Sequence, residues 1–590
     1  MNNLNPKQQK AVKSDGVVVI IAGPGTGKTR ALTARVEYLL TEKKAGPKEI
    51  LALTFTKKAA AQMKERLAHL KSLPFIGTFH AFASQSIPNN NFRIIDQKEQ
   101  LSILEMLMIK NKKSLTQKNL KQLLQEISLS KTNRDLHNKN EVFILYNKFL
   151  QDSNLLDFDD LLLLLYKTIN TNDDFRFEHV LVDEFQDTNN LQYEIIKKLA
   201  SSHLFIIGDP LQSIYTFRGA DSTVFEKIKE DFTGYSKIIF ETNYRSTQSI
   251  IDTSTKLFAG QTPLESAHKS SGLIQLVHTA DEYTEADWIV NKINESIGGT
   301  DLLQASDFSK NKNQNLRLSD FAVIYRTHHV GRVLGQRFSQ SALPYQVIGG
   351  DSPYDQKEIS FIIGVLRYIY DKNKEILDSV SRSGGSDKKV IKIVSTYYDA
   401  LKKLSEKQEN DPLSTLIHKI MEIFNLNKKI AQSQSKQRNL QQFINNLSQF
   451  EKKKNPLKKV IDYLDYLKEH EYYDPKADKV ALMTMHAAKG LEFNTVFICG
   501  FEEGLIPLLK KQNQTDLNEE KRLLYVAITR AKQDLYLFYT DSRQHKKVTI
   551  SRFYELLKNK QLEEIEDAAI EKQKKRKEKW LNKKSQMELF

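Results

Sequence analysis

The sequence predicts an α/β protein in which two parallel-sheet domains are each interrupted by a helical insertion. Short β-branched runs precede helical patterns, as where Val17–Ala22 is followed by a helix starting near Lys28, and this order is typical of βα units. Strand-like runs of this kind recur in both halves of the chain. Two stretches between them, 101–150 and 371–474, are rich in Lys, Asn, Gln, Leu and Ile at helical spacing. We therefore expect two sheet domains and two helical insertions.

Six further runs predict the remaining strands, because each is short, apolar and rich in β-branched or aromatic residues. They are His179–Phe185, His203–Asp209, Ser236–Thr242, Phe321–Arg326, Asn494–Gly500 and Asp534–Thr540. The expected domains are a first sheet domain at 1–85 and 151–248 with an insertion at 86–150, a second at 249–349 and 478–560 with an insertion at 350–477, and a basic flexible tail at 561–590. Residues 381–389, rich in Gly and Ser, predict a flexible loop inside the second insertion.

The length and charge of the chain limit the classes of protein to which it can belong. The chain has 590 residues, and its 88 Lys and Arg exceed its 73 Asp and Glu by 15. At about 150 residues per domain, this length predicts roughly four compact units. The 40% hydrophobic and 27% charged content is typical of a folded protein and excludes disorder for most of the chain. The positive excess favours a polyanionic partner, of which nucleic acid is the commonest.

Membrane and secretory signals are missing from the sequence. The apolar runs Val17–Ala22 and Leu161–Tyr166 are far shorter than the ~20 residues that cross a bilayer. The polar N-terminus lacks the apolar segment of a secretory signal. The single cysteine, Cys499, excludes an internal disulfide framework. We therefore expect a cytoplasmic, nucleoid-associated protein with no membrane partner.

A phosphate-binding loop is the strongest motif. Ala22–Thr29 follows a predicted strand and opens a predicted helix, which is the context that such a loop requires. Its glycines let backbone N–H groups face phosphate oxygens, Lys28 supplies a cation, and Thr29 offers a hydroxyl to Mg²⁺. The alternative is a glycine-rich turn without a ligand. The nucleotide-binding residues expected here are Ala22, Gly23, Pro24, Gly25, Thr26, Gly27, Lys28, Thr29 and Arg30.

Two adjacent acids follow another predicted strand. Asp183 and Glu184 come at its end, where ligands of open α/β sheets gather. We expect Asp183 to hold Mg²⁺ and Glu184 to orient or deprotonate the attacking water, as in a nucleotide hydrolase. A surface acidic pair is the alternative interpretation.

Further segments accompany these two motifs in a fixed order. They are Leu4–Val12, Leu51–Met63, Gly77–Ala83, Gly208–Asp221, Glu241–Thr247, Phe321–His329, Ala481–Phe493 and Glu519–Lys532. Together they resemble the UvrD/Rep/PcrA helicases of superfamily 1, from Leu4 to about Phe553. The resemblance implies two RecA-like motor domains, ATP and Mg²⁺ as cofactors, and 3′–5′ translocation on single-stranded DNA with unwinding of tailed duplex, in DNA repair, replication or recombination. The alternative function is a single-strand translocase that displaces proteins without processive unwinding.

The resemblance also implies roles for individual residues. At the nucleotide it places Gln8 and Tyr244 on adenine, Gln212, Arg245 and Arg530 at the γ-phosphate, and Gly490 and Glu492 at the ribose, so that Lys28, Asp183, Glu184, Gln212, Arg245 and Arg530 form the catalytic set. At the DNA it places Thr54, Phe55, Thr78, His80, Tyr215, Phe217, Arg326, Thr484 and His486. Phe217 replaces the tryptophan typical of the family. A ring there still offers a face on which bases stack.

The last five residues resemble a bacterial sliding-clamp-binding peptide. Its expected contact residues are Gln586, Met587, Leu589 and Phe590, and the sliding clamp is therefore an expected partner. The second insertion lacks the RGIG-type loops that larger relatives use on duplex DNA, so translocation is better supported than strand separation. We expect a monomer or weak dimer.

Overall fold

The structure, a computed structural model, describes residues 4–87, 92–111, 116–135, 140–171, 175–216, 219–221, 223–260, 262–298, 316–349, 356–371, 402, 413–431, 433–451, 453, 455–469, 473–509, 515–567 and 570. They belong to two compact units, Met1–Glu285 with Ala488–Phe590, and Ala286–Ala487. Phe217, the loop at 381–389, most of the basic tail and the expected clamp peptide lie outside the described residues. Within the described ranges, no helix combines the length and apolar character needed to cross a membrane.

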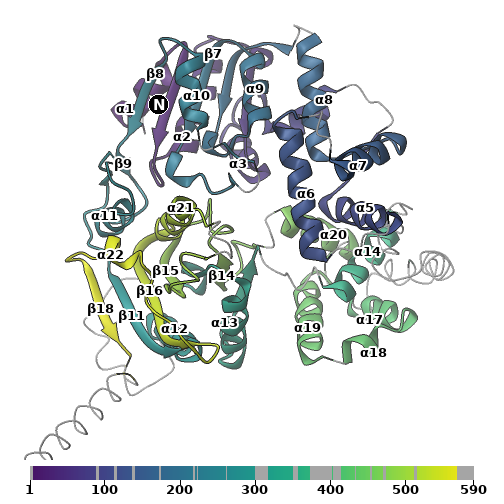
Figure 1. Cartoon of the computed structure of the whole chain (residues 1–590), viewed down its shortest axis with the longest axis vertical. Coiled ribbons are helices and arrows are strands. Elements are labelled where there is room, and N and C mark those ends of the chain that lie inside the picture. Colours follow the sequence, from purple (N-terminus) through teal and green to yellow (C-terminus); the bar gives the residue numbers. More distant parts are fainter. Residues whose placement is uncertain are drawn as a thin grey trace, which may run out of the picture. The chain divides into compact units, whose positions relative to one another are not determined.

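The first unit contains a six-stranded sheet in the order β3-β2-β6-β7-β1-β8 (Figure 1). Every neighbouring pair in it is parallel. The strands are β1 (Val17–Ala22), β2 (Ile50–Thr54), β3 (Phe75–Thr78), β6 (Phe177–Val182), β7 (Ala200–Gly208) and β8 (Ser236–Phe240). The helices of this domain are α1 (Pro6–Lys13), α2 (Lys28–Thr41), α3 (Lys57–Arg66), α4 (Phe79–Ser86), α8 (Phe158–Thr171), α9 (Asn190–Leu199), α10 (Val224–Asp231) and α11 (Gln248–Thr255).

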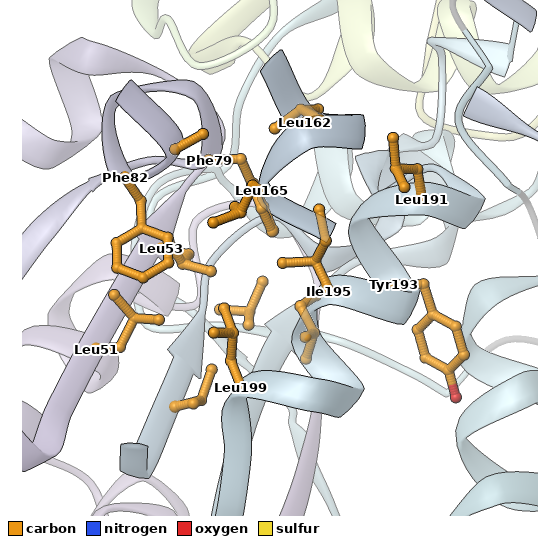
Figure 2. Packing of buried hydrophobic residues seen from close by; sticks show 14 of the residues in the cluster. Leu51, Leu53, Phe79, Phe82, Leu162, Leu165, Leu191, Tyr193, Ile195 and Leu199 are labelled. Carbon is orange, nitrogen blue, oxygen red and sulfur yellow. The ribbon is translucent and has the colours of Figure 1, made fainter. Parts of the chain in front are cut away.

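Both faces of this sheet are covered, as the apolar strands require. All five residues of β2 are buried, and alternate residues enter different cores: Leu51 and Leu53 belong to one cluster, Ile50 and Ala52 to the other. Figure 2 shows the first cluster, in which side chains from α4, α8 and α9 pack over the strands. Each fully buried Leu or Phe contributes about 1.5–3 kcal/mol, so this core fixes the strand ends that carry the motifs.

The first helical insertion has a core of its own. Its helices are α5 (Gln97–Lys110), α6 (Gln117–Thr132) and α7 (Glu141–Asp152). Leu104, Leu120 and Tyr146 are among its buried residues. Two short parallel strands, β4 (Arg93–Ile94) and β5 (Leu155–Leu156), pair where the chain enters and leaves it.

The rest of the first unit carries a second set of parallel strands, in the order β15-β16-β11-β18, with β17 antiparallel to β16. Their bounds are β11 (Ile274–Asp281), β15 (Phe493–Cys499), β16 (Ala531–Arg543), β17 (Lys546–Lys547) and β18 (Leu562–Glu566). Helices α21 (Leu517–Ile528) and α22 (Tyr554–Leu557) accompany them, and β9 (Thr242–Asn243) pairs with β10 (Glu265–Ser266).

The second unit combines three parallel strands with a helical part. The strands run in the order β13-β14-β12, with bounds β12 (Phe321–Tyr325), β13 (Tyr345–Ile348) and β14 (Val480–Thr484). Its helices are α12 (Glu282–Ser296), which begins at the end of the first unit, α13 (His328–Gln340), α14 (Lys357–Asp371), α17 (Leu413–Ile423), α18 (Leu426–Ala431), α19 (Gln434–Ser448) and α20 (Pro456–Glu469). The predicted α/β class with parallel sheets is confirmed. The predicted domain boundaries stay predictions.

Candidate nucleotide and DNA sites

The loop between β1 and α2 has the backbone shape of a phosphate cradle. Gly25 and Gly27 have φ of +71° and +84°, which glycine adopts without strain. A Cβ on Gly25 would lie 2.6 Å from the Arg245 Cβ and 2.7 Å from the Asn243 Oδ1, so glycine is also required sterically. The loop ends at the N-terminus of α2, where unpaired N–H groups favour an anion.

Side chains of the loop hold it in this shape. Thr26 is buried and its Oγ1 donates to the Gly23 carbonyl at 2.8 Å. The Lys28 Nζ donates to the carbonyls of Ala22 at 3.2 Å and Gly23 at 3.4 Å. The ammonium therefore lies on the loop itself, where it can reach a bound phosphate. Thr29 and the exposed Arg30 follow in the first turn of α2.

The predicted acids lie at the carboxyl end of β6. Burial, and then the neighbouring Glu184 charge, raises the pKa of Asp183 to about 7, although Lys28 opposes this rise. Partial burial opposes ionisation of Glu184 as well, yet its pKa is lowered, because Lys28, Lys489 and a hydrogen bond from Gln186 stabilise the carboxylate. Glu184 has φ of +48°, a left-handed conformation that costs a non-glycine residue free energy. The two carboxylates therefore differ in proton affinity, and a cation bound at Asp183 would offset the repulsion that raises its pKa.

Lys489 is a functional candidate that sequence reasoning missed. Its Nζ lies 2.5 Å from the Asp187 Oδ2, donates to the Gln212 carbonyl at 2.8 Å, and sits 5.0 Å from the Tyr215 ring centroid. Asp187 is buried, and its Oδ1 has no hydrogen-bond partner. Lys489 thus connects the acid-bearing loop, the expected γ-phosphate sensor and an expected DNA contact. Its place directly before Gly490 was the available signal.

The two predicted arginines have different surroundings. Arg245 pairs with Glu492, with its Nε and Nη2 each 2.7 Å from one carboxylate oxygen, and Lys532 lies 2.9 Å from the other oxygen. Arg530 is 1% exposed and donates to the carbonyls of Val526 and Leu491. Burial, and then the Arg245 charge, lowers the pKa of Arg530 to about 9. Two cations thus lie close enough to repel, which favours an anion between them.

The residues expected to contact adenine belong to one hydrogen-bonded group. The Gln8 Oε1 accepts from the Asn5 N–H at 3.0 Å, and its Nε2 donates to the Thr26 carbonyl at 2.9 Å. These bonds fix the orientation of the Gln8 amide. The Asn5 Nδ2 donates to the Tyr244 hydroxyl at 2.9 Å, and Tyr244 is 43% exposed. Gln8 and an accessible ring therefore lie on either side of Asn5.

Aromatic side chains mark the candidate DNA surface of the first unit. Phe55 and Tyr215 stack with centroids 5.5 Å apart. His80 meets Phe158 edge to face at 5.3 Å, and Phe158 is 44% exposed, so Phe158 is a second residue that sequence reasoning missed. The Thr78 Oγ1 caps α4 by accepting from the Ala81 N–H. Thr54 is fully buried and its hydroxyl donates to the Thr56 carbonyl at 3.0 Å, so its side chain does not face outward.

The other expected DNA contacts belong to the second unit. β12 and β14 are parallel, with Tyr325 opposite Thr484, so Arg326 and His486 follow the carboxyl ends of neighbouring strands. Thr484 is 8% exposed, and its Oγ1 accepts from the Ala487 N–H at 3.3 Å. The structure thus brings these three residues to one edge of their sheet.

A second group of potential metal ligands occurs among the described residues, away from the phosphate loop: Glu178, His179 and His203 have ligand atoms within 4.8 Å of one another. The two imidazoles stack at 4.4 Å with 12° between their planes, so their in-plane lone pairs run nearly parallel and do not converge. The His203 Nδ1 already accepts from the Gly16 N–H at 2.8 Å. This group is a poor metal site. The donor set that fits Mg²⁺ with a nucleotide is the Thr29 hydroxyl and the Asp183 carboxylate.

Comparison with known proteins agrees with this site. The UvrD/REP helicase N-terminal domain family matches residues 4–233, and the UvrD-like helicase C-terminal domain family matches residues 238–383 and 373–542. The chain belongs to the UvrD/Rep/PcrA family of superfamily 1 helicases.

Individual relatives share most of their length with the chain. It is 30% identical over 626 residues to the ATP-dependent DNA helicase PcrA of Bacillus subtilis (strain 168), covering 91% of this chain and 82% of that protein. It is 31% identical over 629 residues to the protein of the same name from Staphylococcus epidermidis, covering 92% and 84%, and 30% identical over 630 residues to that from Staphylococcus aureus, covering 92% and 84%.

Proposed function

We propose that the protein is an ATP-dependent DNA helicase that moves 3′ to 5′ on single-stranded DNA, with ATP and Mg²⁺ as cofactors. The observation that carries this proposal is the joint position of Lys28, Asp183 and Glu184, whose charges act on one another at the carboxyl edge of the six-stranded sheet. The similarity to helicases called ATP-dependent and DNA-acting supports the same conclusion.

The residues divide the chemistry among them. Asp183 and Thr29 would hold Mg²⁺, which neutralises phosphate charge when bound. Glu184, kept ionised by Lys28 and Lys489, would orient the attacking water and accept its proton. Arg245 and Arg530 would stabilise the charge that develops on the transferred phosphoryl group. Arg245 would have to leave Glu492 to do so, which would release Glu492 for the ribose.

Directional movement requires that nucleotide binding change the affinity for the strand. The Lys489 contacts supply a physical connection, because one ammonium touches Asp187 on the nucleotide side and lies over Tyr215 on the proposed DNA side. Phe55 and Tyr215 would stack on bases. From the sequence, we also propose that the protein binds the sliding clamp and acts in DNA repair, replication or recombination. We propose that it is a monomer or weak dimer.

The decisive experiment is an ATPase assay run in parallel without nucleic acid, with single-stranded DNA and with single-stranded RNA. We expect DNA to stimulate hydrolysis and Lys28→Ala to abolish it. Unwinding of a 3′-tailed duplex, compared with a 5′-tailed one, then tests direction. If the protein displaces streptavidin from a biotinylated strand but leaves the tailed duplex intact, the translocase alternative is correct. Equal hydrolysis by Lys28→Ala would refute the proposal.

A further inference from the structure

A buried lysine joins the first helical insertion to the six-stranded domain. Lys131, in the last turn of α6, is 1% exposed, and its Nζ lies 2.7 Å from the Asp157 Oδ2 and 2.8 Å from the Asp160 Oδ1. Tyr146 of α7, also fully buried, donates its hydroxyl to the Asp157 Oδ2 at 3.2 Å. We call Lys131, Tyr146, Asp157 and Asp160 the lysine clamp.

The lysine clamp binds the first turn of α8 through ion pairs and hydrogen bonds. The Asp160 N–H donates to the Asp157 Oδ1 at 2.9 Å, and the Asp157 N–H donates to the Asp160 Oδ2 at 3.3 Å. The two acids thus cap the helix reciprocally while both bind Lys131. Figure 1 shows α6 beside α8. A cation held by two capping carboxylates leaves the start of α8 little freedom to move.

The residue that begins α8 is Phe158, and it determines the position of His80. The imidazole of His80 and the ring of Phe158 meet edge to face at 5.3 Å. The ring of Phe158 therefore packs directly against His80. The contacts run without a break from Lys131 through the two acids and Phe158 to His80.

We propose that Lys131 is a positioning residue for DNA binding, through which the first helical insertion holds His80 and Phe158 in the orientation that grips the strand. The inference rests on the proposed function, which makes His80 a DNA contact. Lys131 itself is too deeply buried to touch DNA. Its effect is indirect, since without the ammonium the two acids lose their shared partner and the start of α8 is released.

The effect of removing the ammonium on DNA binding must be distinguished from the effect of lower protein stability. Lys131→Met keeps the length of the side chain and removes its charge, but leaves the Asp157 and Asp160 carboxylates without their shared cation. Lys131→Met combined with Asp157→Asn removes one of these carboxylates and keeps a good helix cap. Leu124→Ala, in the core of the same insertion, is the matched control, because it lowers stability without touching the lysine clamp.

The test is a fluorescence-anisotropy titration of a labelled single-stranded oligonucleotide with each full-length variant, alongside its melting temperature. We expect Lys131→Met and its double variant to raise Kd about tenfold, within the range for losing one stacking contact. We expect Leu124→Ala to lower the melting temperature and keep the wild-type Kd. Adding Lys131→Met to His80→Ala should weaken binding no further than His80→Ala alone, because Lys131 acts through His80.

The outcomes distinguish failure of the positioning role of Lys131 from failure of the proposed function. A wild-type Kd in the Lys131→Met, Asp157→Asn protein would overturn the positioning role, and so would equal weakening by Leu124→Ala or additive weakening with His80→Ala. Failure of the wild-type protein to bind the strand would overturn the proposed function, and this inference with it.

Discussion

Two groups of carboxylates in the first unit have opposite bonding patterns. At the lysine clamp, Asp157 and Asp160 are matched by Lys131, Tyr146 and the helix N–H groups. At the nucleotide site, the Asp187 Oδ1 is buried without a partner, and the acids beside Asp187 repel one another. Buried polar groups are normally satisfied. The lysine clamp therefore has a structural role. The acids of the nucleotide site retain unused bonding capacity, which suits a cation and a phosphate.

The largest effect is expected at the nucleotide site. Glu184→Gln removes the proposed base while keeping the size of the side chain, so the kcat for ATP hydrolysis should fall about 100- to 10,000-fold. ATP binding, measured by equilibrium titration with a fluorescent analogue, should remain. An unchanged kcat would show that Glu184 does not act on the water.

A second change removes Lys489, the cation that pairs with Asp187. Lys489→Met should lower the free energy of unfolding by about 3–5 kcal/mol, because it leaves a buried carboxylate without its partner. Urea denaturation measures the loss. Combining it with Asp187→Asn should restore part of the stability, and a double variant less stable than Lys489→Met would contradict this account.

The smallest effect is expected at the edge of the lysine clamp. Burial, and then the Asp157 charge, raises the pKa of Asp159 to about 6, above the value near 4 of an unfolded chain. The folded protein then binds more protons than the unfolded one between these values, so this group's contribution to stability falls as pH rises from about 4 to 6. Asp159→Asn should therefore be more stable than wild type at pH 7 and equal to it near pH 4.

Urea denaturation of both proteins across this range checks the prediction. Asp152→Asn, which changes an exposed acid at the end of α7, is the control and should show no such difference between pH 4 and pH 7. A stability difference for Asp159→Asn that is the same at pH 4 and pH 7 would show that the carboxylate does not titrate in this way.

Features that depend on neighbours along the chain could be predicted from the sequence. The alternation of β-branched strands with helices, the glycines of the phosphate loop and the Asp183–Glu184 pair each carry their signal within a few residues. The family motifs added the arginines and the adenine contacts, whose roles stay predictions. The α/β class and the helicase family are confirmed.

Contacts between residues far apart in the sequence depend on the whole fold and could not be predicted from the sequence. Lys489 binds Asp187 across 302 positions, and Asn5 binds Tyr244 across 239, pairings for which the chain carries no local signal. The burial of individual side chains was equally hard to predict: Thr54 lies inward, while Phe158, between Asp157 and Asp159, is exposed beside His80. The physical reason is that parallel strands bring their carboxyl ends to one edge whatever their order in sequence. Packing, which is set by the whole fold, then decides which side chains remain available there.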